Sequence, residues 1–92
     1  MNWTILIVPS FLKDLASLPA KVRGRVERFV FVILPAAANP QSVGKVEKLQ
    51  GFPDYFKVRI GQYRLGLRLD KVERQVLVLR VLHRREIYRH FP

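Results

Sequence analysis

Apolar and polar residues alternate along the second half of the chain, from Phe56 to Asp70. Because successive side chains of a β-strand point to opposite faces, this alternation predicts strands with one buried and one exposed face. Gly61-Gln62 interrupts the pattern and predicts a tight hairpin turn, after which a second strand runs from Tyr63 to Asp70. The face expected to be buried carries Phe56, Val58, Ile60, Tyr63, Leu65, Leu67 and Leu69, and the exposed face carries Lys57, Arg59, Arg64, Gly66, Arg68 and Asp70.

The N-terminal part of the chain predicts a strand followed by a helical hairpin. Trp3 to Val8 is short, apolar and rich in β-branched residues, which predicts a strand buried on both faces. Ser10 is the expected N-cap of the first helix, and Pro19 is expected in the first turn of the second. The first helix is indicated by apolar residues at helical spacing, Phe11, Leu15 and Leu18.

The segment from Pro19 to Leu34 predicts the second helix, with one alternative. Apolar residues keep helical spacing along it, namely Val22, Val26, Phe29, Val30 and Ile33. The β-branched and aromatic residues of Phe29 to Leu34 would suit a buried strand equally well. A helix is favoured because the spacing continues from Val22 without a break signal.

The remaining segments complete a single α+β domain over residues 1–92. Pro35 to Val43 is rich in proline and alanine and predicts a loop. Gln75 to Leu82 is apolar at nearly every position, which places it in the middle of a sheet. Arg84 to Phe91 is long enough for a short terminal helix. The expected fold is an N-terminal strand, a helical hairpin, and a mostly antiparallel sheet of about three to four strands ending in that helix.

Charge narrows the classes of partner. The chain carries 17 Lys and Arg against 7 acidic residues, a formal charge of +10, which predicts nucleic acid or an acidic protein as partner. It has no cysteine, and its 2 histidines lack nearby carboxylates, so neither a metal nor another cofactor is expected. The apolar run ending at Leu34 is too short to span a bilayer, and Met1-Asn2-Trp3 does not resemble a signal peptide, so the cytoplasm is expected.

The exposed face of the hairpin gathers cations, namely Lys57, Arg59, Arg64 and Arg68. Like charges on neighbouring strands repel, and Asp70 is the one acid expected on this face. A solvated surface or a site for an acidic protein would explain such a face. A site for a phosphate-bearing substrate would explain it too.

A second basic group, His83-Arg84-Arg85, stands where the last strand should end, close enough to converge with the hairpin. His83 alone would more often be structural. Tyr88 lies off the apolar stripe of the terminal helix, which favours a role in a site or at a packing edge.

Arg80, inside an apolar strand, must be paired or lie at the exposed end of the sheet. The second helix carries further cations that form a solvated face or contact a nucleic-acid backbone, Lys21, Arg23, Arg25 and Arg28.

The motif Lys48-Leu49-Gln50-Gly51-Phe52-Pro53-Asp54-Tyr55-Phe56-Lys57-Val58-Arg59 and the ending His83-Arg84-Arg85-Glu86-Ile87-Tyr88 resemble the RelE toxins. The resemblance covers nearly the whole chain and implies a microbial RNase-like fold and the toxin half of a type II toxin-antitoxin pair. RelE toxins cleave messenger RNA in the ribosomal A site. By this resemblance the catalytic residues are Lys57, Arg59, Arg64, Arg84 and Tyr88. Further candidates for catalysis or RNA binding are His83, Arg85 and Arg68.

Three details of the resemblance bear on the site. Family members often carry lysine at the position of Arg59, and many carry glycine at the position of Leu82. Arg85 remains an alternative to Arg84, because aligning the ending with some relatives needs a short gap.

The resemblance implies attack of a ribose 2′-hydroxyl on the adjacent phosphodiester, giving a cyclic phosphate and a free 5′-hydroxyl without a metal. Arginine keeps its proton in proteins, so Lys57 is the expected base. Arg59 would stabilise the charge that develops on the phosphorane. Arg64 and Arg84 would hold the non-bridging phosphate oxygens, and Arg84 or His83 would lie nearest the leaving oxygen. Tyr88 would orient the substrate or stack on it.

Two other functions fit the same residues. The ParE branch shares the fold and poisons DNA gyrase, although its members generally lack the full set of Lys57, Arg64, Arg84 and Tyr88. A module that binds RNA or the ribosome without cutting is the third possibility. The resemblance also implies a RelB-like antitoxin with an acidic segment, operator DNA bound only by the pair, a monomeric free toxin and no membrane partner.

Overall fold

Five strands form a single sheet, and a computed structural model describes residues 3–92 of the chain. The strands are β1 (Thr4–Ile7), β2 (Val46–Lys48), β3 (Tyr55–Ile60), β4 (Tyr63–Asp70) and β5 (Gln75–His83). The helical elements are α1 (Pro9–Ala16), α2 (Ala20–Arg28), the π turn η1 (Phe29–Ile33), α3 (Leu34–Ala36), the 3₁₀ turn η2 (Pro40–Ser42) and α4 (Ile87–His90).

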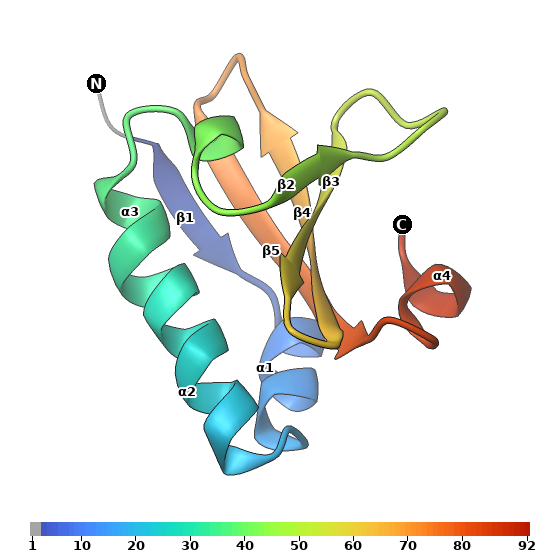
Figure 1. Cartoon of the computed structure of the whole chain (residues 1–92). Helices are drawn as coiled ribbons and strands as arrows, with labels where there is room; N and C mark the ends of the chain where they lie inside the picture. The colour runs from blue at the N-terminus through green and yellow to red at the C-terminus, as the bar shows by residue number, and fades with distance from the viewer. Residues whose placement is uncertain (1–2) are drawn as a thin grey trace.

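In the strand order β1-β5-β4-β3-β2, the first strand of the chain lies beside the last. β1 runs parallel to β5, and every other pair of neighbours is antiparallel. α1, α2 and α3 lie over one face of the sheet, while α4 lies on the opposite side (Figure 1). The predicted α+β fold, including the central place of the strand that begins at Gln75, is therefore confirmed.

The predicted alternation in the β3–β4 hairpin is confirmed. The strands pair in the register that the turn at Gly61-Gln62 requires, with Gly61 at a φ of 59°, a left-handed conformation that glycine adopts without strain. The core side chains are each at most 7% exposed, and they are Phe56, Val58, Ile60, Leu65, Leu67 and Leu69. Their neighbours along the strands point to the other face of the sheet, which we call the open face.

The prediction that the first strand is buried on both faces is wrong. β1 is an edge strand whose burial alternates: Ile5 and Ile7 pack against the core, whereas Thr4 and Leu6 are exposed. Of the helices, α1, α2 and α3 lie over one face of the sheet, and β1 has a strand neighbour on one side only. An apolar run therefore did not mean burial on both faces here.

The predicted N-cap of the first helix is also wrong. α1 begins at Pro9, after Val8, which makes no side-chain capping bond. The Ser10 hydroxyl instead donates a hydrogen bond to the carbonyl of Leu79, 2.8 Å away on β5. α2 begins at Ala20, one residue later than predicted, with Pro19 directly before it.

The ambiguous segment from Phe29 to Leu34 is helical, as favoured, and not a strand. Its first five residues form the π turn, in which the N–H of Leu34 reaches the carbonyl of Phe29. The helix then continues through Pro35 to Ala36, so the predicted loop begins two residues late, at Ala37. Proline crowds the carbonyl four residues earlier in a regular α-helix, and the wider turn directly before Pro35 relieves that crowding.

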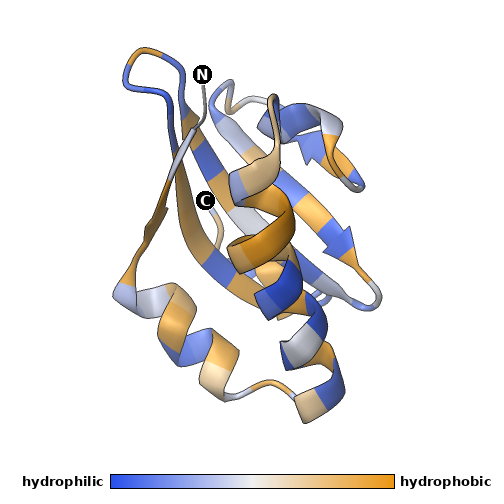
Figure 2. Cartoon of the chain, turned by 90° about the vertical axis from the view of Figure 1, so that its left-hand side faces the viewer, coloured by the Kyte–Doolittle hydropathy of each residue, from blue (hydrophilic) through white to orange (hydrophobic). Residues whose placement is uncertain are grey.

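The π turn divides its apolar residues between the core and the surface. Phe29 and Val30 are buried, whereas Phe31, Val32 and Ile33 are 49%, 54% and 37% exposed. Figure 2 shows the resulting change along the helix, from a polar α2 to an apolar stretch at its C-terminal end. Within residues 3–92, no helix has both the length and the apolar character needed to cross a bilayer.

The edge of β5 that extends beyond β1 is closed by α1. β1 pairs with β5 only as far as Val78, and Asp14 then accepts hydrogen bonds from the Val81 N–H at 3.1 Å and from Arg80 Nε at 2.7 Å. The hydrogen bond that Arg80 donates to Asp14 raises the pKa of the arginine above its ordinary value. Arg80 is therefore paired, which decides between the two alternatives left by the sequence.

A close contact on the open face anchors the C-terminal segment. The ring of Phe91 lies directly on Gly66, where a Cβ atom would sit 2.6 Å from two ring carbons. Ile87 and Phe91 are 1% and 5% exposed. Only glycine permits this approach, so Gly66 decides where α4 can pack.

Replacing Asp14 with Ala is expected to lower the free energy of unfolding by about 2 kcal/mol, because Arg80 and the Val81 N–H lose a charged acceptor. Asp14→Asn keeps one carbonyl oxygen and should lose about half as much. Urea unfolding followed by the fluorescence of Trp3 measures both, with the exposed Lys13→Ala as control. Equal stability of Asp14→Ala and Lys13→Ala would contradict the assignment.

Gly66→Ala is expected to cost about 1–3 kcal/mol, since the added methyl group overpacks against Phe91. Hydrogen exchange at the amides of α4 should also accelerate, because the helix loses its anchor. Gly24→Ala is the matched control: its Cβ meets nothing within 4 Å, and alanine in a helix should leave stability equal or raise it. The cost of Gly66→Ala should largely disappear in a Phe91→Ala background, and an undiminished cost there would refute the overpacking explanation.

Candidate functional site

The register of β3 and β4 brings the predicted site residues of the hairpin together on the open face. Arg59 lies directly opposite Arg64, and Lys57 lies opposite Gly66, one side-chain row further along. Arg68 lies opposite Tyr55, on the far side of Lys57 from the arginine pair. The sheet therefore presents its strongest positive charge next to the β3–β4 turn.

The end of β5 adds the second basic group to the same turn. The backbone N–H of Arg84 donates to the carbonyl of Gln62 at 2.8 Å, which fastens this residue to the β3–β4 turn. Arg25 of α2 reaches the turn from the other side, because a Cβ at Gly61 would lie 3.0 Å from its Nη1 atom. We call the set Arg25, Arg59, Arg64, Arg84 and Arg85 the cationic end.

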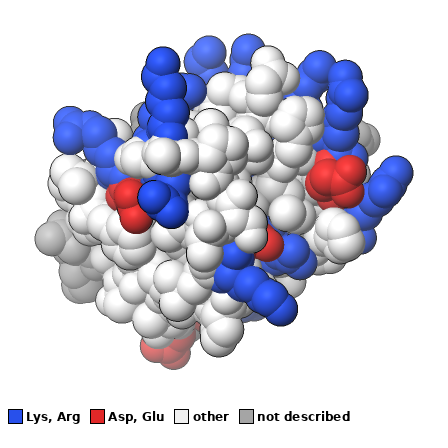
Figure 3. Space-filling model, turned by 90° about the horizontal axis from the view of Figure 1, so that it is seen from below, with Lys and Arg blue, Asp and Glu red and all other residues white. Residues whose placement is uncertain are grey.

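The guanidinium groups of the cationic end differ in their partners. Arg64 Nη1 donates to the carbonyls of Gly61 and Tyr63, at 3.0 and 3.1 Å, and thereby braces the turn. Within residues 3–92, the guanidinium groups of Arg59, Arg84 and Arg85 have no hydrogen-bond or ion-pair partner. Viewed from below, Lys and Arg side chains project around the rim of the molecule, and acidic groups lie between some of them (Figure 3). The unpartnered groups are free to bind an anion.

His83 is occupied by the turn that leads to α4. Its Nδ1 accepts a hydrogen bond from the N–H of Arg85 at 3.2 Å, and its ring packs edge-on against Tyr63, with 5.4 Å between ring centroids. Its carbonyl accepts from the N–H of Glu86. These contacts give His83 a structural task whether or not it also contacts substrate.

Lys57 meets Tyr88 across the open face. Lys57 Nζ donates a hydrogen bond to the Tyr88 hydroxyl and lies 4.7 Å from the centroid of its ring. The lysine side chain is 19% exposed, whereas Tyr88 is 65% exposed. The contact joins β3 to α4, residues 31 positions apart, and it depends on the packing of Phe91 against Gly66.

Glu47 is a residue of this site that the sequence analysis missed. It lies opposite Lys57 in the pairing of β2 with β3, and its Oε2 is 4.0 Å from Lys57 Nζ. Asp70, the one acid expected on this face, instead accepts from the N–H groups of Val72 and Glu73 and caps the β4–β5 turn. The expectation was wrong because the pairing partner of β2 could not be read from a strand of only three residues.

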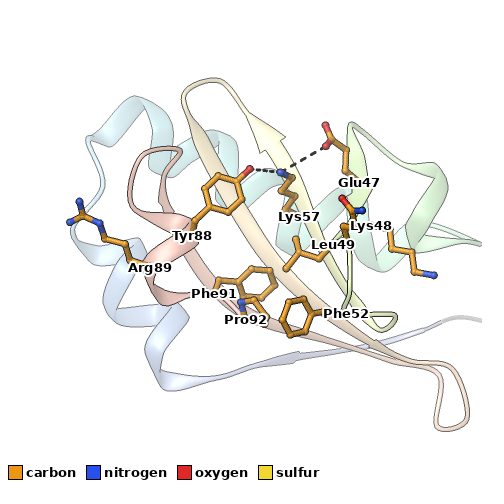
Figure 4. A pocket seen from close by; sticks show the side chains of 10 residues that line it. Glu47, Lys48, Leu49, Phe52, Lys57, Tyr88, Arg89, Phe91 and Pro92 are labelled. Carbon is orange, nitrogen blue, oxygen red and sulfur yellow. Dashed lines mark hydrogen bonds and ion pairs between the residues drawn. The ribbon is translucent and has the colours of Figure 1, made fainter.

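A groove of about 640 Å³ opens beside Lys57. Its walls come from β2, the β2–β3 loop, β3 and the C-terminal segment: Glu47, Lys48, Leu49, Gln50, Phe52, Lys57, Tyr88, Arg89, Phe91 and Pro92. Lys57, Glu47 and Tyr88 form a polar side, while Leu49, Phe52, Phe91 and Pro92 form an apolar one (Figure 4). Arg89 points away from the groove and pairs with Glu86 at 3.8 Å.

The arrangement is suited to binding an extended phosphate-bearing chain. The cationic end can hold phosphate oxygens, and Lys57 with Tyr88 lies next to it on the same face. Within residues 3–92, no three His, Asp or Glu side chains gather closely enough to hold a metal ion. The site thus offers guanidinium, ammonium and phenol groups with a single carboxylate among the residues that line the groove.

Comparisons with known proteins identify the family. A family model described as the ParE toxin of the type II toxin-antitoxin system parDE matches residues 5–88. Toxin RelE3 of Methanocaldococcus jannaschii is 30% identical over 92 residues, which cover 96% of this chain and 98% of that protein. Toxin RelG of Mycobacterium tuberculosis is 35% identical over 89 residues, which cover 97% of this chain and 99% of that toxin.

Solved structures agree with the sequence relatives. A chain of the RelB-RelE antitoxin-toxin complex from Methanococcus jannaschii has a TM-score of 0.79 and 28% identity, covering 95% of this chain and 99% of that one. A chain of the RelBE2 toxin-antitoxin complex from Mycobacterium tuberculosis has a TM-score of 0.72 and 28% identity, covering 91% and 100%. This chain belongs to the RelE family of the RelE/ParE toxin superfamily and is the toxin type of a type II toxin-antitoxin system.

Proposed function

We propose that this toxin is a ribosome-dependent endoribonuclease that cuts messenger RNA in the ribosomal A site and so inhibits translation in the cytoplasm. The proposal is carried by the contact between Lys57 and Tyr88 beside arginines of the same face that have no partner within residues 3–92. Cationic donors without carboxylate partners are available to phosphate oxygens. A protein whose basic face served only solubility would not need to hold Lys57 against a tyrosine hydroxyl.

In the proposed reaction, the ribose 2′-oxygen attacks the adjacent phosphorus and the bond to the 5′-oxygen breaks. Lys57 takes the proton of the 2′-hydroxyl, and a water molecule passes a proton to the departing 5′-oxygen. Arg59 and Arg84 stabilise the charge that builds up on the phosphorane oxygens. No step requires a metal, and the products are a cyclic phosphate and a free 5′-hydroxyl.

The same residues explain why the ribosome would be needed. Efficient general acid–base catalysis uses groups that titrate near neutral pH, usually histidine or a carboxylate. His83 is engaged in the turn before α4, so the proposed roles fall to Lys57 and the arginines, with neither a histidine nor a carboxylate as acid or base. Holding the messenger in a reactive geometry would then supply much of the acceleration, and the ribosome is the natural source of that order.

An antitoxin is the second proposed partner. Both structural relatives described above were solved as complexes with an antitoxin. By analogy, a RelB-like antitoxin would bring an acidic segment to the cationic end and cover it, which the charge of +10 favours. The free toxin would be a monomer, and only the toxin-antitoxin complex would bind operator DNA.

One observation favours a second candidate function. The family model that matches the chain carries the ParE name, and ParE toxins poison DNA gyrase. The RelE-named relatives and the presence of Lys57, Arg64, Arg84 and Tyr88 together favour cleavage of RNA.

Arg84→Ala is expected to lower the rate of A-site cleavage about 10²–10³-fold, because one donor to the phosphorane oxygens is lost. Toeprinting of a defined messenger on ribosomes with an occupied P site and an empty A site measures the cut. Arg85→Ala, the neighbouring arginine, should change the rate less than about tenfold, and Lys71→Ala on the β4–β5 turn should have no effect. A larger loss of cleavage rate for Arg85→Ala than for Arg84→Ala would assign the stabilisation of the phosphorane to Arg85. Inhibition of gyrase supercoiling by a toxin that leaves the messenger intact would contradict the proposal.

Lys57→Ala is expected to lower the single-turnover cleavage rate about 10²–10⁴-fold, since the proton acceptor is removed. Glu47→Gln keeps the shape of the groove but removes its carboxylate, and it should stay within about tenfold of the native rate. Single-turnover assays with saturating toxin measure the chemical step for both variants. An equal loss for the two would make Glu47 the proton acceptor instead.

A further inference from the structure

The apolar side of the groove has no part in the proposed bond cleavage. Phe52 is 46% exposed on the loop between β2 and β3. Leu49, Phe91 and Pro92 continue the same wall beyond it. In Figure 4 this wall lies across the groove from Lys57 and Tyr88. An exposed aromatic next to a cationic site requires an explanation of its own.

Phe52 is held firmly in place. Its ring packs edge-on against Tyr55, with centroids 6.1 Å apart, and Tyr55 packs in the same way against Phe91 at 5.7 Å. The loop itself is closed by backbone hydrogen bonds, from Phe52 N–H to the Leu49 carbonyl and from Tyr55 N–H to the Phe52 carbonyl. Gly51, at a φ of 84°, allows the sharp bend before Phe52. A fixed ring of this kind can act as a stacking platform.

The chemistry of the groove matches one nucleotide unit. Lys57 supplies positive charge at its polar side, Phe52 supplies a flat apolar face, and Gln50 adds an amide donor and acceptor to the lining. Proteins that read single-stranded RNA stack unpaired bases on aromatic side chains while cations hold the backbone. A side chain of a peptide could pack against the apolar wall, but a peptide would not need the adjacent phosphate-binding cations.

We propose that the groove is a base-binding subsite, in which an RNA base flanking the scissile phosphate stacks on Phe52. This inference rests on the proposed function, because it takes the phosphate at Lys57 and the cationic end as its starting point. Tyr88 lies beside Lys57, across the groove from Phe52, and would contact a different part of the substrate. The subsite therefore contributes to the choice of sequence that is cut, and Gln50 is positioned to read the edge of the bound base.

The test uses ribosomes programmed with a messenger that cannot be cut, because a 2′-deoxy nucleotide stands at the cleavage site. One probe carries 2-aminopurine beside that nucleotide, and a second carries an abasic residue in the same place. Phe52→Ala should bind the 2-aminopurine probe about fivefold to 150-fold more weakly than the native protein and should lose the change in its fluorescence. Phe52→Tyr, which keeps the ring, should retain both, and Val72→Ala, an exposed apolar residue on the β4–β5 turn, is the control.

The abasic probe completes a thermodynamic cycle. With the native protein, replacing 2-aminopurine by the abasic residue should weaken binding by the same factor as the Phe52→Ala substitution does. With the Phe52→Ala variant, the same replacement should weaken binding no further. Equal binding of the two probes by the native protein, or native-like binding by Phe52→Ala, would overturn the subsite and leave the wall to a protein partner. Base-dependent binding by a toxin that leaves the 2′-hydroxyl messenger uncut would support the subsite while the proposed cleavage fails.

Discussion

Burial of only one face of the sheet is the constraint on which the rest of this structure depends. α1, α2 and α3 cover a single face, so every second side chain of β3 and β4 must enter the core beneath them, and those between must point to the open face. The register then sets Arg59 directly against Arg64 on the open face. Repulsion between such neighbours opposes folding, and it is offset by the apolar side chains on the reverse of the same strands. The core thereby holds together a group of charges that would otherwise separate.

Arginine occupies two contrasting environments in this small protein. Arg80 is matched by Asp14, which also satisfies the backbone where β5 has no strand neighbour, and this pair belongs to the fold. Arg59 and Arg84 have no such counterpart within residues 3–92. With 7 acids in the chain, few are left for the cationic end. The difference separates a charge used for stability from charges kept available for an anionic partner.

The groove and the contact between Lys57 and Tyr88 depend on one glycine in the sheet. Gly66 sits opposite Lys57 in the register and gives Phe91 room to lie on the strand. That packing holds α4 on the open face, and α4 carries Tyr88 to Lys57. Phe91 also extends the aromatic wall toward Phe52. A position with no side chain thus links the chemistry at Lys57 to the surface that would receive a base.

The sequence by itself determined the features that depend on local periodicity: the β3–β4 hairpin, its two faces, the helix through Phe29 and the set of candidate cations. Tertiary structure decided the rest. β1 became an edge strand, Ser10 and Asp14 turned to β5, and Glu47 came to face Lys57 through the pairing of β2. Periodicity states which side chains share a face, because it follows from the geometry of one strand or helix. It cannot state which segments become neighbours, because that depends on contacts between residues far apart in the chain.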